Sequence, residues 1–140
     1  MMRIISALIG AVALGAVGIG VWGRTTSVSA ARYHDSFAVP DEDLQTRDAF
    51  VASRSTDEDG FARLIDIIAA TPRTTRLAGR PEEGHVSFVT RTRLMRFPDV
   101  TNVLRTEDGV AIRGQAVLGN GDMGVNRQRI EGWLRDAGLS

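Results

Sequence analysis

The N-terminal part of the chain is a long apolar stretch. The segment Ile4–Trp22 reads IISALIGAVALGAVGIGVW and contains no charged residue. At about 1.5 Å of rise per residue, a helix of this length matches the roughly 30 Å hydrocarbon core of a bilayer. Arg3 and Arg24 flank the segment, and Trp22 stands where an interfacial aromatic residue belongs. The pattern predicts an N-terminal membrane anchor in residues 1–24, with residues 4–22 in contact with the membrane.

The same stretch is compatible with a signal peptide. Val28 and Ala30 in SVSAAR satisfy the small-residue rule for cleavage, although the apolar run is longer than the usual ~7 to 15 residues. We expect an uncleaved anchor, and cleavage stays open as the alternative. With either outcome the short basic N-terminus favours a cytoplasmic start and places the rest of the chain outside the cytoplasm. The uncleaved anchor predicts a bacterial inner-membrane protein with its soluble domain in the periplasm.

Residues 25–55 are polar and show no sustained period. The segment also contains Pro40. This composition predicts a tether that becomes extended near Phe37–Val39. Periodic patterns begin after this segment. We therefore expect a folded domain in residues 56–140.

The first helix of that domain is predicted by one apolar stripe. Four apolar residues recur at helical spacing, and Pro72 forbids further helix after them: Phe61, Leu64, Ile65 and Ile68. Thr56 followed by Asp59 resembles a capping box. The helix is expected to begin there.

Between Thr74 and Leu118 the period changes to two. Four alternating segments are separated by turn-forming Pro, Gly and Asp residues: TTRLAG, HVSFVTRTRLM, VTNVLRT and VAIRGQAVL. They predict a four-stranded antiparallel meander whose apolar face carries Val86, Phe88, Leu94, Leu104, Val110, Ile112 and Leu118. For the last hairpin we expect a three-residue Glu107–Gly109 loop, because it sets Leu104 opposite Ile112 and keeps apolar residues on one face.

The last helix follows the segment GNGDMGVNRQRIEGWL. Asp122 is its predicted N-cap and Gly138 its terminator, and its stripe consists of Ile130, Trp133, Leu134 and Ala137. Each helix has one apolar stripe, so both are expected on the same face of the sheet. The predicted fold class is α+β: an N-terminal transmembrane helix, then a two-layer sandwich of a four-stranded antiparallel meander with two helices on one face.

Composition narrows the function classes. The 17 basic residues, all arginine, balance 17 acidic residues, so we expect no binding to nucleic acid. The absence of cysteine excludes disulfides, thiolate ligands and cysteine nucleophiles. The two histidines, His34 and His85, lack ligand spacing, and no pattern of nucleophile and base is present. We therefore predict no catalytic residue, metal site or cofactor, with an enzyme of unrecognised type as an alternative.

Three segments resemble a bacterial family called Domain of Unknown Function 1499, over roughly residues 57 to 137: TPRTTRLAG, GHVSFVTRTRLMRFPDVTNV and GDMGVNRQRIEGWL. The family's closing motif is matched by Asp122, Gly124, Val125, Asn126, Arg127 and Arg129, and its aromatic-to-aspartate bend by Phe97, Pro98 and Asp99. Upstream, Arg113 and Gly119 fit, whereas serine or arginine is more usual at the positions of Gly114, Ala116, Val117 and Gly121. Short anchored members resemble those of alphaproteobacteria. The resemblance implies a fold and its extent, and no activity.

We expect the motif residues to be structural: Phe97, Asp99, Gly119, Asp122, Gly124, Asn126, Arg127 and Arg129. Asp122 and Asn126 would satisfy the backbone where the last strand turns into the helix. Arg127 or Arg129 would reach a carboxylate such as Asp99. Asp122→Ala is then expected to lower thermal stability. The alternative is an anion held at the helix N-terminus by Asn126 and Arg127.

A candidate anion- or partner-binding surface is the sheet face away from the helices. By the pairing above, four arginines point to that side without an alternating acid: Arg91, Arg93, Arg105 and Arg113. They would engage anionic lipid or an acidic envelope protein. The alternative is a face that is solvated or covered by the acidic Pro40–Asp43 segment.

Together these patterns predict a membrane-anchored extracytoplasmic domain, a noncatalytic interaction or accessory protein of the cell envelope. A binding module for a lipid or small amphiphile is the alternative. An apolar pocket between the sheet and the helices would favour it.

Overall fold

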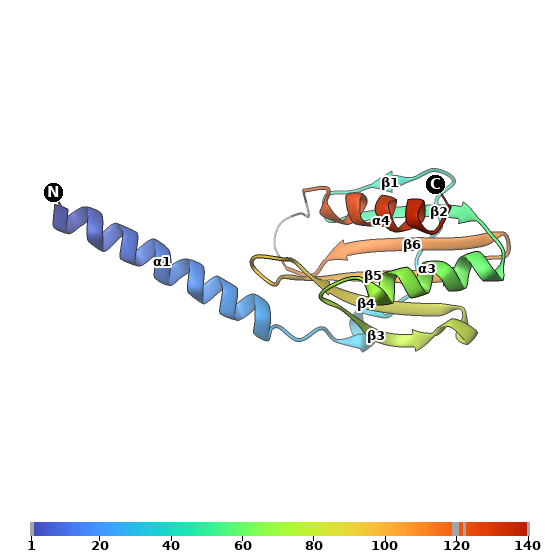
Figure 1. The fold of residues 1–140 in the computed structure, drawn as a ribbon, viewed down its shortest axis with the longest axis horizontal. Helices are drawn as coiled ribbons and strands as arrows, with labels where there is room; N and C mark the ends of the chain where they lie inside the picture. The colour runs from blue at the N-terminus through green and yellow to red at the C-terminus, as the bar shows by residue number, and fades with distance from the viewer. Residues whose placement is uncertain (1, 119–120, 122, 140) are drawn as a thin grey trace.

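The computed structural model describes residues 2–118, 121 and 123–139. Helix α1 (Met2–Thr25) extends away from a domain in which α3 (Glu58–Ala70) and α4 (Val125–Asp136) cover one face of an antiparallel sheet (Figure 1). In spatial order the described strands are β1 (Leu44–Gln45), β2 (Ala49–Ser55), β6 (Gly109–Ala116), β5 (Pro98–Arg105), β4 (His85–Arg91) and β3 (Thr74–Arg80). Two short helices complete the list, α2 (Ala30–Tyr33) and the 3₁₀ turn η1 (Pro81–Glu83). The α+β class and the shared helix face are confirmed, but the sheet has six strands instead of four.

Helix α1 is long and apolar enough to cross a membrane. Its apolar side chains do not pack on the domain: Leu8, Val12, Leu14 and Val17 are all exposed. The helix approaches the domain only at its C-terminal end, where Trp22 and Gly23 lie (Figure 1).

The two predicted amphipathic helices are present with their apolar stripes buried. The sheet and both stripes form one core, to which α3 contributes Phe61, Leu64, Ile65 and Ile68, and α4 contributes Ile130, Trp133 and Leu134. The indole Nε1 of Trp133 donates to Thr71 Oγ1 at 2.8 Å, which ties α4 to the end of α3. The predicted start of α3 is wrong. Its N-cap is Asp57, whose carboxylate accepts from the backbone N–H of Gly60 at 2.9 Å.

Strand β2 lies in the segment expected to be a tether. It pairs antiparallel with β6 along its whole length and places Phe50 and Ala52 in the core. Val51, which points to the other face, is also buried. A strand buried on both faces shows a short apolar run without alternation, so the period-two pattern did not predict it.

The β5–β6 hairpin has a shorter loop than expected. The backbone groups of Thr106 and Gly109 bond each other across a two-residue loop, Glu107–Asp108. Gly109 belongs to β6, where β2 passes so close that a Cβ would lie 2.2 Å from the carbonyl oxygen of Arg54. The glycine is therefore required by strand packing, and the predicted three-residue loop is wrong.

This register exchanges the two faces of β5. Leu104 lies opposite Ala111, and Val103 lies opposite Ile112. Because a slip of one residue moves every side chain to the other face, Val103 joins the core while Leu104 faces away from the helices. Arg105, paired with Val110, turns towards the helices.

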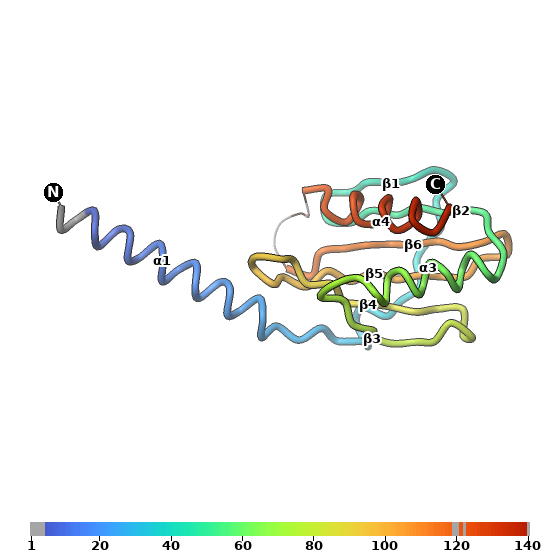
Figure 2. The backbone as a smooth tube through the Cα atoms, viewed as in Figure 1, coloured from blue at the N-terminus to red at the C-terminus, as the bar shows by residue number. Residues whose placement is uncertain are grey.

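Residues 26–43 cross the sheet face opposite α3 and α4; we call this segment the tether. In Figure 2 its blue-to-cyan trace runs from the end of α1 past β3 and behind the sheet to β1. His34 Nδ1 lies 2.8 Å from Ser87 Oγ on β4, and Asn102 Nδ2 on β5 donates to the carbonyl oxygen of Tyr33 at 2.8 Å. The tether thus adds a layer to the predicted two-layer sandwich.

Candidate functional site

The four arginines expected on one face are separated by the structure. Arg105 points to the helix side, where its guanidinium lies 4.5 Å from the ring centroid of Phe61 and forms an ion pair with Glu58. The predicted orientation of Arg105 is wrong because the hairpin loop is one residue shorter than expected. Its guanidinium stabilises the contact between β5 and α3.

Arg113 lies on the predicted face, under the tether. Its guanidinium forms an ion pair with Asp35 and lies 4.8 Å from the ring centroid of Phe37. The tether therefore supplies an acid that pairs with this arginine. That acid is Asp35, and not a residue of the Pro40–Asp43 segment, which the alternative interpretation placed over the face. Within that segment Asp43 binds Arg54 through both carboxylate oxygens, at 2.7 and 2.8 Å, and this hydrogen bonding lowers the pKa of Asp43.

Arg91 holds the end of α1 against the domain. Its Nη1 donates to the carbonyl oxygen of Gly23 at 2.7 Å, and its Nη2 donates to that of Thr26 at 2.8 Å. These carbonyls belong to the last turn of α1 and the residue after the helix, where intrahelical partners are lacking. The anchor and the sheet are thus linked by charge-assisted hydrogen bonds.

Arg93 lies in the loop after β4 and not on a strand. The loop comprises residues 92–97, of sequence TRLMRF, and we call it the β4–β5 loop. Leu94, expected in the core, is 81% exposed at its tip. Phe97 closes the loop and contacts Trp22 of α1 edge-on, with ring centroids 6.1 Å apart. This loop is therefore the part of the domain next to the anchor.

The closing motif forms a buried polar joint between β5 and α4. Arg129 Nη1 lies 3.1 Å from Asp99 Oδ2 and 3.1 Å from Asn126 Oδ1. Asp99 and Asn126 are buried. We expected Arg127 or Arg129 to reach a carboxylate such as Asp99, and the structure shows that Arg129 does so.

Glycine at position 114 on β6 makes room for this joint. A Cβ there would lie 2.8 Å from Asn126 Oδ1 and 3.0 Å from Ile130 Cδ1. The glycine at position 114 thus lets α4 approach the sheet closely.

Two further residues of the closing motif, Arg127 and Gly124, lie outside the joint. Arg127 pairs with Glu131 one turn along α4, and its guanidinium lies 5.5 Å from the ring centroid of Phe50. The N-cap of α4 is Gly124, with φ of 77°, in place of the predicted Asp122. Gly119 and Asp122 lie outside the described residues, so the other structural roles predicted for them, apart from the N-cap, stay predictions.

A cavity of about 250 Å³ opens between the β4–β5 loop and the start of α4. Its described lining is mostly apolar, with Asp99 of the joint among the polar groups: Thr92, Phe97, Asp99, Ala116, Leu118, Gly121, Met123 and Val125. Motif residues therefore surround a small apolar cavity at the anchor end of the domain. Its volume is just below the roughly 300 to 1,000 Å³ of most ligand pockets.

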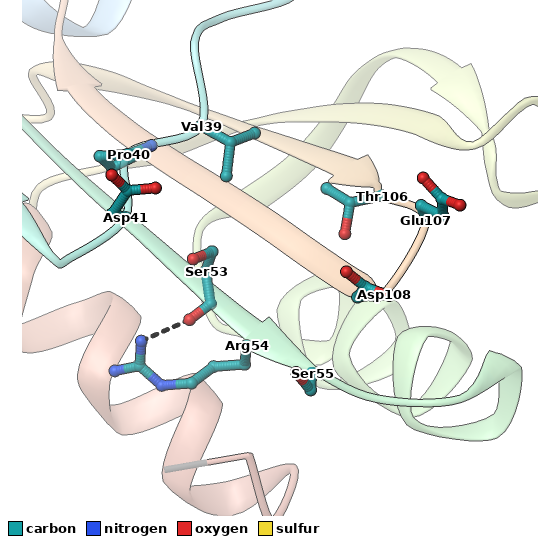
Figure 3. A pocket seen from close by; sticks show the side chains of 9 residues that line it. All are labelled: Val39, Pro40, Asp41, Ser53, Arg54, Ser55, Thr106, Glu107 and Asp108. Carbon is teal, nitrogen blue, oxygen red and sulfur yellow. Dashed lines mark hydrogen bonds between the residues drawn. The ribbon is translucent and has the colours of Figure 1, made fainter.

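A second cavity, of about 430 Å³, lies at the opposite end of β5 and β6. Figure 3 shows Val39, Pro40 and Asp41 of the tether facing the end of β2 and the β5–β6 turn, which carries Glu107 and Asp108. The hollow is acidic.

His34 of the tether and His85 of β4 form a stacked pair that the sequence pattern did not predict. The rings of His34 and His85 stack, with centroids 3.8 Å apart and planes 15° from parallel. His85 Nε2 lies 2.9 Å from Asn102 Oδ1. Burial lowers the pKa of His34, and the neighbouring His85 lowers it further. The two residues are far apart in the chain and meet only because the tether folds back over β4, so spacing gave no signal.

The described residues contain no group of three or more histidine or acidic side chains placed to hold a metal ion. Several of their arginines pair with carboxylates of another element, as in Arg129–Asp99, Arg113–Asp35 and Arg105–Glu58. These arrangements stabilise the fold and hold the anchor.

Residues 24–136 match a family model described as "Protein of unknown function (DUF1499)". The match includes the tether, which lies upstream of the segments that carried the resemblance. No curated protein matches the chain, and no solved structure matches it.

Proposed function

The chain belongs to the DUF1499 family, and from this premise we propose that it is a membrane-anchored extracytoplasmic protein of the bacterial cell envelope, with a noncatalytic interaction or accessory role. The observation that carries the proposal is α1. Its apolar residues are exposed over the length of a membrane span, while its C-terminal end is bonded to the domain by Arg91. An exposed apolar surface of this size is unfavourable in water, at about 25 cal/mol per Å².

The short basic N-terminus supports a cytoplasmic start and an exported domain. The ion pairs between elements support a noncatalytic role, because the charges in these pairs are held by structural partners. A catalytic acid or base needs a group available to a substrate.

Cell fractionation tests the anchor and its orientation. The full chain, expressed in a Gram-negative bacterium, is expected in the carbonate-resistant membrane fraction and should be degraded by protease added to spheroplasts. In the matched control, Leu14→Arg with Val17→Arg, each charge at the bilayer centre costs about 2.5 to 3.5 kcal/mol, and the protein should leave the membrane fraction.

Three outcomes of this experiment would contradict the proposal. A wild-type chain in the cytosol would overturn the membrane location. A domain protected from protease in intact spheroplasts would overturn the orientation. A soluble periplasmic protein whose N-terminus begins after Ala30 would overturn the anchor in favour of a signal peptide.

A lipid or small amphiphile binding module is the second candidate, favoured by the apolar cavity beside Phe97 and Met123. Native mass spectrometry of the full chain, released from membranes in mild detergent, should then show a retained lipid. Ala116→Leu narrows the cavity and should reduce that fraction. Wild-type protein free of bound lipid would remove this candidate.

A further inference from the structure

We infer that the β4–β5 loop docks into the headgroup region of an anionic membrane beside α1, with Leu94 inserted among the lipids and Arg93 and Arg96 on their phosphates. The inference rests on the proposed function, because α1 must bring the domain to the bilayer. The loop is not the basic sheet face that we expected from the sequence. Three of the four arginines of that face, Arg91, Arg105 and Arg113, bind other parts of the chain.

The loop is preformed. The backbone N–H of Thr92 donates to the carbonyl oxygen of Phe97 at 2.9 Å, and the N–H of Phe97 donates to Thr92 Oγ1 at 2.9 Å. Arg96 has a φ of 60°, and its carbonyl oxygen accepts from Arg91 Nη1 at 3.2 Å. A loop fixed in this way presents its tip without a large ordering cost on binding.

The loop lies at the membrane end of the domain. A Cβ added at Gly23 would be only 2.2 Å from the carbonyl oxygen of Met95, so loop and helix are in direct backbone contact. Trp22, whose ring meets that of Phe97, is the aromatic residue expected at the bilayer surface. The loop therefore lies at the level of the headgroups when α1 spans the membrane.

The chemistry of the loop fits an anionic bilayer. Leu94 is 81% exposed, and Met123, across the apolar cavity, is 94% exposed. Arg93 and Arg96 form no ion pair within the described part of the chain, and the loop contains no carboxylate. Apolar tips flanked by cations are typical of surfaces that enter the membrane interface.

The opposite end of the same strands has the opposite charge. The turn after β5 carries Glu107 and Asp108, which line the same hollow as Asp41 (Figure 3). The β4–β5 loop at the anchor end thus carries cations without a carboxylate, whereas three carboxylates and Arg54 line the hollow at the far end. This polarity favours a membrane surface as the occupant over an acidic protein, because α1 brings lipid phosphates to the basic end without a further partner.

Site-directed spin labelling tests the docking, since the chain has no native cysteine. Single cysteines replace Val12 in α1, Leu94 in the loop, and Glu107 at the far end. The labelled full chain is reconstituted into vesicles of phosphatidylcholine alone, or of equal parts phosphatidylcholine and phosphatidylglycerol. Accessibility to oxygen and to a water-soluble nickel chelate then reports the depth of each label.

The label at Val12 is expected in the hydrocarbon core of both vesicles, and the label at Glu107 in water. The label at Leu94 should be shielded from nickel in the phosphatidylglycerol vesicles. Replacing Arg93 and Arg96 by Gln should lower the ratio of docked to undocked loop about fivefold per arginine in those vesicles. The matched control, Arg80→Gln with Arg135→Gln, removes the same charge from exposed sites at the far end and should leave the ratio unchanged.

The accessibilities of the three labels distinguish a failure of the docking from a failure of the anchor. If Val12 is immersed while Leu94 is as accessible as Glu107, the docking is overturned and the anchor stands. If Val12 is itself in water, the anchor fails and the docking fails with it. Equal immersion of Leu94 in both vesicles, or equal effects of the two double variants, would overturn the role of anionic headgroups.

Discussion

Replacing Asp99 tests whether the joint between β5 and α4 is structural. Asp99 is 4% exposed, and its carboxylate pairs with Arg129, which also contacts Asn126. Asp99→Asn keeps the volume but leaves the guanidinium in a largely buried site without its counter-charge. Breaking a buried pair in this way costs about 3 to 5 kcal/mol. For a domain of this size, the melting temperature should then fall by roughly 10 °C or more.

The assay follows the tryptophan fluorescence of the full chain in mild detergent during heating and in urea. Trp133 is buried in the core between α3 and α4, so its emission reports unfolding of the domain. All variants are made in a parent chain that carries Trp22→Phe. This substitution removes the second tryptophan and keeps an aromatic ring beside Phe97. The helical signal of α1 does not enter this measurement.

A double-mutant cycle gives the refuting result. Arg129→Met alone strands the Asp99 carboxylate, whereas the double variant removes both charges, so its loss should be smaller than the sum of the single losses by more than about 1 kcal/mol. Arg127→Met is the control on the same helix, because its exposed pair with Glu131 contributes only about 0.3 to 0.5 kcal/mol. Additive losses, or a variant Asp99→Asn that melts like the wild type, would contradict a structural joint.

Three further predictions follow from other contacts. The fold lowers the pKa of His34, so the folded state binds fewer protons than the unfolded chain; stability should fall as the pH drops below its usual value of 6.5, and melting temperatures across that range should fall less for His34→Gln. Arg91→Ala removes the hydrogen bonds to the end of α1, and trypsin should cut after Arg24 faster in detergent, whereas an unchanged rate would mean that the bonds do not hold the helix. Gly114→Ala places a methyl group 2.8 Å from Asn126 Oδ1 and should lower the free energy of unfolding in urea by about 1 to 3 kcal/mol; no loss would show that α4 can shift freely.

The sequence predicted those elements whose burial is one-sided. The stripe from Phe61 to Ile68 identified α3, and the stripe from Ile130 to Leu134 identified α4, because each helix covers the sheet with one face only. Strand β2 escaped detection because it is buried on both faces: Phe50 lies in the core, and Val51 on the opposite face is also buried. An alternation of apolar and polar residues identifies a strand only when one face is buried and the other is exposed. A strand buried on both faces lacks that alternation.

The candidate site was less predictable because it depends on register and on contacts distant in sequence. Gly109 fits both the loop that we expected and the strand position that it occupies, and the choice is made by the close approach of β2. That choice turned Arg105 towards α3 and removed it from the basic face. A pairing of Asp99 with an arginine of the closing motif was predictable from their complementary charges, but the choice of Arg129 over Arg127 required the structure.

The position of β2 in the sheet sets the order in which the domain can form during synthesis. Residues 49–55 emerge early, yet their neighbour in the sheet is β6, and Phe50 is also covered by α4. A nascent polypeptide that ends before Gly109 leaves this strand paired only with the two-residue strand β1. The sheet is therefore completed only after β6 has been synthesised, and a polypeptide interrupted earlier lacks the strand that joins β2 to β5.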